Sequence, residues 1–323
     1  MKDLLLVSKK NNFFRIYVCA ILMLFNQSAF CQTSDTVPLL ATTNNISYHV
    51  SDTTTVTKKK KIYHVNYISG SIVILGGLAS DYPAIGRIKG KPGLSTDEIN
   101  ALNPGELNFI DKWGLHQPTN NYLAYSKVSD LIQIPMFTLF PAALALDKKI
   151  RKNFLDVAMM YCEGHVFTFT LYNYSWFGPT FQNKYRPITY YTNLPLADRT
   201  TGNNRNSDYS GHTASTAYTS FFIAKVYCDY HPELGGAKYL LYTAALIPPV
   251  VMGYLRIRSL AHFPSDCLTG LTIGALVGVL LPEVHKYKCK NISLSMLNIP
   301  GATGLDMCWT LPSFQTPPSQ SHL

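Results

Sequence analysis

The 323-residue chain has little charge. Asp, Glu, Lys and Arg make up 15% of it, against roughly 25% in an average soluble protein. Acidic residues are the scarcer kind, with 19 Asp and Glu against 28 Lys and Arg, so the formal net charge is +9. Hydrophobic residues make up 47%. This composition predicts a membrane environment or a very apolar interior, and the basic excess favours an anionic partner such as phosphate or an acidic lipid surface.

Several patterns that would indicate other classes of protein are missing. There is no zinc-finger spacing, no ribonucleoprotein-type aromatic motif and no basic stripe beyond Lys58–Lys61, so we expect no nucleic-acid partner. No two of the seven cysteines have CxxC spacing, and we therefore expect no zinc or redox site and no metal. Five cysteines follow residue 31, and because five is odd, at least one thiol is free or paired elsewhere.

Residues 1–31 have the pattern of a secretory signal peptide. A basic flank precedes the short apolar run Ile16–Phe25, and Ala29 and Cys31 occupy the minus-three and minus-one positions of a cleavage before Gln32. A run of about ten apolar residues is short for a membrane span, and an uncleaved membrane anchor is the alternative. The segment predicts a protein of the cell envelope.

Residues 32–64 form a polar linker rich in Thr, Ser and Asn, and residues 65–286 form the folded domain. Within that domain no segment is a clean run of twenty apolar residues, and several carry Pro, Gly or a charge. Six apolar segments nevertheless follow one another, at about 65–80, 130–146, 155–177, 213–228, 239–255 and 268–282.

These segments predict an all-α fold, a helical bundle of about six core helices. Their lengths suit either a membrane bundle or a compact soluble core, and the composition favours membrane association with the number of spans open. A polar insertion at 81–125 separates the first two segments. The tail at 287–323 has a short β-like character, because NISLSMLNI and GLDMCWTL alternate like strands.

Three short motifs between residues 183 and 266 carry the polar residues of greatest interest. They are motif 1, Asn183–Pro187; motif 2, Asp208–Ser215; and motif 3, Tyr254–Asp266. Pro187 disfavours the helical conformation at Arg186, so motif 1 is predicted to end a helix.

Motif 2 is predicted to open a helix, with Ser210 as N-cap and Gly211 allowing close approach of backbone to a ligand. The free N–H groups at such a helix start bind anions. Motif 3 closes an apolar run in which seventeen positions carry no charge, and buried charge needs a partner. It nevertheless holds four ionisable residues, which are Arg256, Arg258, His262 and Asp266.

Together the motifs supply histidines, arginines, a hydroxyl, free amides and a carboxylate, which suit the binding and transfer of a tetrahedral oxyanion. The pattern resembles the type 2 phosphatidic acid phosphatase and vanadium haloperoxidase superfamily, whose signature is KxxxxxxRP, then PSGH, then SRxxxxxHxxxD. The resemblance covers roughly residues 130–285 and rests on the matching residues Arg186, Pro187, Ser210, Gly211, His212, Arg256, His262 and Asp266.

The resemblance implies a phosphoric ester hydrolase that cleaves a phosphomonoester or diphosphate, lipid-linked in our reading, through a phosphohistidine and without metal or cofactor. His262 would be the nucleophile, with Asp266 accepting a proton from one of its ring nitrogens. His212 would protonate the leaving alkoxide and then activate water. The phosphate oxygens would be bound by Arg186, Arg256, Ser210, Gly211 and Lys184.

Three positions depart from the signature. Pro179 stands where the family has its lysine, Tyr209 replaces the proline before Ser-Gly-His, and Leu255 replaces the serine before an arginine. Lys184 and Arg258 are the two candidates to replace the missing lysine, and the sequence does not choose between them. Loss of a cation would weaken transition-state stabilisation.

Two other functions stay open at this stage, a vanadate-dependent haloperoxidase and a catalytically weakened membrane protein that binds lipid phosphate. The partner expected for the phosphatase is a phosphorylated lipid or a small phosphomonoester. We expect membrane association in the cell envelope, with the active site facing the periplasm or the exterior. The oligomeric state and the particular ester are not determined by the sequence.

Overall fold

The computed structural model describes residues 61–286 and the two strands at 292–299 and 302–309. The predicted signal peptide at 1–31 and the predicted linker up to residue 60 lie outside these described residues.

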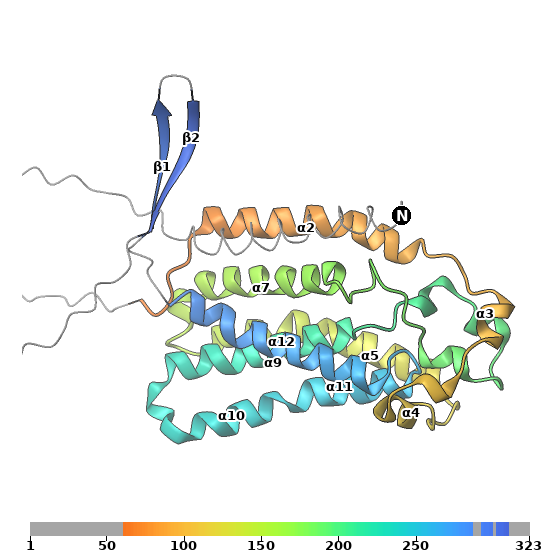
Figure 1. The fold of residues 1–323 in the computed structure, drawn as a ribbon. Coiled ribbons are helices and arrows are strands. Elements are labelled where there is room, and N and C mark those ends of the chain that lie inside the picture. Colours follow the sequence, from red (N-terminus) through yellow and green to blue (C-terminus); the bar gives the residue numbers. More distant parts are fainter. Residues whose placement is uncertain (1–60, 287–291, 300–301, 310–323) are drawn as a thin grey trace, which may run out of the picture.

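Long helices run side by side as a bundle (Figure 1), and this confirms the predicted all-α fold. Two consecutive helices, α10 and α11, cover the predicted segment 239–255, because Pro248 and Pro249 lie in the first turn of the second. The bundle helices are α2 (Tyr67–Lys89), α5 (Tyr122–Phe137), α7 (Phe154–Tyr174), α9 (Gly211–Tyr230), α10 (Lys238–Ala245), α11 (Ile247–Arg258) and α12 (Pro264–Val284).

Short helices connect the long ones. Those of the predicted insertion 81–125 lie at one end of the bundle (Figure 1), and the first residues of that insertion belong to α2 because the helix continues through Pro83. The connecting helices are α3 (Thr96–Asn100), η2 (Pro104–Glu106), α4 (Phe109–Gly114), α6 (Leu139–Ala142), η3 (Ala143–Leu146), η4 (Arg151–Asn153), η5 (Pro187–Tyr190), α8 (Leu196–Arg199), η6 (Gly202–Arg205) and η7 (Pro232–Ala237).

The tail contains the two strands that its alternating pattern predicts. Strands β1 (Ile292–Ile299) and β2 (Ala302–Trp309) pair antiparallel as a hairpin, with Ile292 opposite Trp309.

Helices α9 and α12 make the closest helix–helix contact, through glycines spaced four residues apart on α12. A Cβ atom at Gly274 would lie 2.0 Å from the carbonyl oxygen of Ala214, and one at Gly270 would lie 2.5 Å from that of Ser210. Small residues at this spacing allow the two backbones to touch. The starts of α9 and α12 are therefore held together, and the backbone N–H of Ser210 donates to the carbonyl oxygen of Asp266 over 3.0 Å.

Four helical segments are long and apolar enough to cross a membrane, by length and composition: Tyr67–Lys89, Tyr122–Leu146, Pro232–Arg258 and Pro264–Val284. Their outer faces expose large apolar side chains such as Leu75, Leu131 and Leu240. Contiguous apolar surface of this kind is costly in water and favourable in lipid. The fold thus supports membrane association.

Candidate active site

Backbone hydrogen bonds bring the three motifs together at one end of the bundle. Just after motif 1, the N–H of Ile188 donates to the carbonyl oxygen of Leu260 in motif 3 over 3.1 Å. Motif 2 is joined to motif 3 by the bond from Ser210 to Asp266 described above. The motifs, separated by up to eighty residues in the sequence, thus share one site.

Motif 1 does not end a helix, and that prediction is wrong. Helix α7 ends at Tyr174, and Arg186 has the extended angles φ −74° and ψ 153° because proline follows it. The extended segment pairs with residues 204–207: the N–H of Arg186 donates to Asn204 O over 2.8 Å, and the N–H of Ser207 donates to Lys184 O over 3.0 Å. This pairing places Ser207, which precedes motif 2, beside motif 1.

His262 is buried, with 2% of its surface exposed. Its Nδ1 lies 2.6 Å from the carbonyl oxygen of Ser207. A carbonyl only accepts hydrogen bonds, so Nδ1 carries the proton, and Nε2 of the neutral ring keeps a free lone pair. Burial, followed by the charges of Arg256 and Arg186, holds the pKa of His262 well below its ordinary value. The ring is therefore neutral, and Nε2, the nitrogen that does not contact Ser207, is its unprotonated nitrogen.

Asp266 was predicted to accept the ring proton of His262, and the structure pairs the two residues differently. The fully buried Asp266 accepts from the Ser207 hydroxyl over 2.6 Å and from the backbone N–H of Phe263 over 2.9 Å. The carboxylate thus binds Ser207, whose carbonyl oxygen fixes the tautomer of the His262 ring, and Phe263, which follows His262 in the sequence. Its action on His262 passes through Ser207.

Two guanidinium groups lie close enough for their charges to act on each other and on His262. Burial and the Arg256 charge lower the pKa of Arg186 to about 10. Arg256 is buried, and its Nη1 donates to the Ser129 hydroxyl over 2.9 Å. Among the residues that the structure describes, its Nε has no hydrogen-bond partner. Two neighbouring cations with an unused donor form a site suited to an anion.

His212 is the second residue of α9, and its Nε2 lies 2.8 Å from an Asp130 carboxylate oxygen. The same oxygen lies 3.7 Å from Nη1 of Arg256. Burial and the Arg256 charge lower the pKa of His212 to about 4, and Asp130 partly opposes this shift. Sequence reasoning missed Asp130; the one signal was a carboxylate at the edge of the apolar segment 130–146.

Ser210 is the N-cap of α9, as predicted. Its buried hydroxyl oxygen accepts from the backbone N–H of Thr213 over 3.3 Å and from the Thr213 hydroxyl over 2.9 Å. This oxygen is therefore engaged in capping. The free N–H groups of the first turn, beginning at Gly211, are the donors that this helix start offers to an anion.

Both candidates for the missing lysine have partners in the structure. The ammonium of Lys184 forms an ion pair with Asp266 and donates to the Ser265 hydroxyl over 3.2 Å. The guanidinium of Arg258 lies over the ring of Tyr125, 4.8 Å from its centroid, and reaches Gln117 Oε1 at 3.5 Å. Each of the two cations is thus bound to side chains other than Arg186 and Arg256.

Tyr209, in place of the family's proline, packs in the core. Its ring centroid lies 5.5 Å from that of Tyr172 and 5.7 Å from that of Phe177. The substitution therefore anchors motif 2 to the end of α7 by aromatic contacts.

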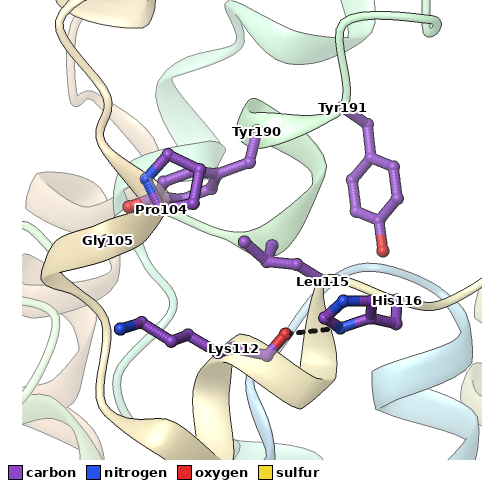
Figure 2. A pocket seen from close by; sticks show the side chains of 7 residues that line it. All are labelled: Pro104, Gly105, Lys112, Leu115, His116, Tyr190 and Tyr191. Atoms are coloured by element: carbon purple, nitrogen blue, oxygen red, sulfur yellow. Dashed lines mark hydrogen bonds between the residues drawn. The ribbon is translucent and has the colours of Figure 1, made fainter.

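A cavity of about 490 Å³ lies beside the site, between the insertion and η5. Figure 2 shows Lys112 and His116 along one side and Pro104 with Tyr190 opposite them. The ring of Tyr190 contacts Phe263 edge-on, with centroids 6.0 Å apart, so one ring layer separates the cavity from motif 3. None of the predicted site residues lines it.

Neither a metal cluster nor a disulfide is found in the described part of the chain. No group of three or more His, Cys, Asp or Glu side chains there is placed to hold a metal ion. Cys162, Cys228 and Cys267 are free thiols.

The fold and the site define a helical-bundle protein with a buried imidazole whose pKa is lowered by burial and by the charges of two arginines. Residues 159–290 match the family model of the PAP2 superfamily. The match includes all three motifs and confirms the family that the sequence pattern indicated. The match supports a phosphatase-type hydrolase.

Among solved structures, the chain is similar to the crystal structure of the first transmembrane PAP2 type phosphatidylglycerolphosphate phosphatase from Bacillus subtilis. The identity is 18%, the match covers 67% of this chain and 94% of that one, and the TM-score is 0.38. A search of curated protein sequences finds no match to this chain.

Proposed function

We propose that the protein is a phosphatase that cleaves a phosphomonoester or diphosphate through a phosphohistidine at His262. The observation that carries the proposal is the tautomer of this buried ring. The Ser207 carbonyl oxygen holds the proton on Nδ1, and burial, with the charges of Arg256 and Arg186, lowers the pKa of the ring and keeps it neutral. A neutral imidazole with a lone pair beside two guanidiniums is a nucleophile next to an oxyanion site.

In the first step, Nε2 of His262 attacks phosphorus and the bond to the leaving oxygen breaks. The two guanidiniums bind the nonbridging oxygens, and the first-turn N–H groups of α9 add hydrogen bonds. The phosphate's negative charge offsets that of Arg256 and raises the pKa of His212, so its ring is protonated when substrate is bound. Because Nε2 of His212 bonds to Asp130, Nδ1 gives its proton to the leaving alkoxide.

In the second step, the now neutral Nδ1 of His212 takes a proton from water, and the resulting oxygen nucleophile attacks phosphorus. The P–N bond to His262 breaks as the P–O bond forms, which returns the neutral imidazole and releases inorganic phosphate. One histidine thus acts as nucleophile and the other first as acid and then as base.

A lipid-linked substrate is the class we favour, because four helical segments are long and apolar enough to span a membrane. With the secretory pattern at residues 1–31, this supports a place in the cell envelope with the site facing the periplasm or the exterior. Phosphatidate and polyprenyl diphosphate are the lipids to test first.

The test uses the purified full-length protein in lipid nanodiscs and measures phosphate release from phosphatidate, polyprenyl diphosphate and a chromogenic monoester. We expect the wild type to release phosphate from at least one of them and His262→Ala to release none. His231→Ala is the matched control, since His231 pairs with Asp147 at the far end of α9. Release by His262→Ala at the wild-type rate would refute the proposed nucleophile, and a wild type inactive on all three would favour a phosphate-binding protein.

A further inference from the structure

A carboxylate from the polar insertion reaches the start of the helix that carries Asp266. Asp111 lies on α4 and is only 1% exposed. Its Oδ1 accepts from the backbone N–H of Ser265 over 3.0 Å, and its Oδ2 accepts from the Ser265 hydroxyl over 2.7 Å. Asn108 holds the carboxylate from the other side, with Nδ2 donating to Oδ2 over 2.8 Å. Asp111 thus caps α12 from a separate part of the chain.

The same carboxylate belongs to a continuous polar chain that ends at His262. Asp111 Oδ2 lies 3.6 Å from the ammonium of Lys184, which also contacts the Ser265 hydroxyl and forms the ion pair with Asp266. Asp266 in turn accepts from the Ser207 hydroxyl, and the Ser207 carbonyl oxygen binds Nδ1 of His262. Asp111 and Asp266 are therefore two buried carboxylates that both lie within ion-pair distance of one ammonium.

The charged groups of this polar chain, Asp111, Lys184 and Asp266, depend on one another. Two buried carboxylates without a cation would repel each other, and the partly buried ammonium without them would be uncompensated. With Asp111 in place, Lys184 is held by contacts to α4 and α12 together. The orientation of Asp266, and through it the position of Ser207, then follows from a residue outside the three motifs.

We infer that Asp111 is a positioning residue for the reaction, which fixes His262 through Lys184, Asp266 and Ser207. The inference rests on the proposed function, since it concerns the nucleophile of that reaction. It gives the insertion a role in catalysis, and it assigns Lys184 to the support of His262 rather than to the substrate phosphate.

Asp111→Asn is the sharpest single change. An amide of the same size keeps an acceptor for the Ser265 N–H, but it removes the charge beside Lys184 and turns an N–H donor toward the Ser265 hydroxyl. We expect kcat to fall about 10- to 100-fold, because misplacing a reacting group by around 1 Å costs about that much. KM is expected to stay within about threefold, since Asp111 touches no substrate. Asp97→Asn, which removes an exposed carboxylate from the same insertion, is the matched control.

Coupling to Lys184 separates positioning from a general loss of stability. In a Lys184→Met background, Asp111→Asn is expected to lower kcat by less than about threefold, because the route through the ammonium is already broken. Ser265→Ala, which deletes the hydroxyl between Asp111 and Lys184, supplies a second variant that keeps the backbone N–H, and we expect it to lower kcat with KM unchanged. Each protein is first checked for a monodisperse elution profile in nanodiscs.

Two results would overturn the inference while leaving the proposed function intact. One is an Asp111→Asn protein with the kcat and KM of Asp97→Asn. The other is an equal fold-loss from Asp111→Asn with and without Lys184, together with full activity of Ser265→Ala. Failure of the proposed function would look different, because His262→Ala would then be as active as the wild type.

Discussion

The contact between α9 and α12 is the part of the fold on which the site depends most directly, and Gly274→Ala tests it. A Cβ atom there would lie 2.0 Å from the carbonyl oxygen of Ala214, whereas real Cβ atoms essentially never approach closer than 3.0 Å. This neighbour is a backbone atom and cannot rotate away, so the two helices must separate by about 1 Å. That separation pulls Ser210 from Asp266, whose backbone bond is 3.0 Å long.

Displacement of about 1 Å at reacting groups costs roughly 100-fold in rate, and overpacking of a tight contact costs about 1–3 kcal/mol of stability. We therefore expect Gly274→Ala to lose about 100-fold in kcat/KM and to melt at a lower temperature. Gly76→Ala is the control, because a Cβ atom there meets nothing within 4 Å. The assay is phosphate release with a parallel thermal melt, and wild-type values for Gly274→Ala in both would refute the packing argument.

Three further predictions concern the charges of the site. Asp130→Asn removes the group that opposes the lowering of the His212 pKa, so the alkaline limb of the kcat–pH profile should move to lower pH. The shift should be less than about one unit, since an exposed pair contributes at most about 1 kcal/mol. An unmoved limb would exclude His212 as the acid. In the wild type, the alkaline limb of the kcat profile, which reports the substrate complex, should lie at higher pH than that of kcat/KM, which reports the free enzyme. The reason is that the free enzyme holds the pKa of His212 at about 4 and bound phosphate raises it. Limbs at the same pH would contradict this. Arg256→Met should lose at least about 100-fold in kcat. Arg258 contacts Tyr125 and Gln117, so the kcat of Arg258→Met should stay within about threefold of the wild-type value. Equal losses in the two variants would show that Arg258 acts on the substrate.

The sequence predicted those features of the site that are determined by local chemistry. Ser210 caps the start of α9 because a capping hydroxyl acts within a few residues of itself. The order and spacing of the motifs, with the family resemblance, also indicated that Arg186, Arg256 and His262 belong to one site. Their charges do act on one another in the structure.

The features that sequence reasoning missed arise from contacts between distant segments. Motif 1 was predicted as a helix end from its proline alone, and its extended form depends on pairing with residues 204–207. The spacing of Asp266 four residues after His262 suggested a direct hydrogen bond, but the Ser207 carbonyl oxygen occupies Nδ1. The roles of Asp111 and Asp130 could not be predicted locally, because each contacts a residue more than eighty positions away, and the only signal for Asp130 was its place at the edge of an apolar segment.

Trapping the covalent intermediate tests the central claim most directly. Wild-type protein in nanodiscs is mixed with a substrate labelled with ³²P on the transferred phosphate, quenched in alkali within milliseconds, and digested for peptide mapping. We predict label that survives alkali and is lost in acid, as a phosphoramidate requires, on the peptide that contains His262, and none in His262→Ala. Phosphate release by the wild type with no such label at any quench time, or with label on His212, would contradict the account.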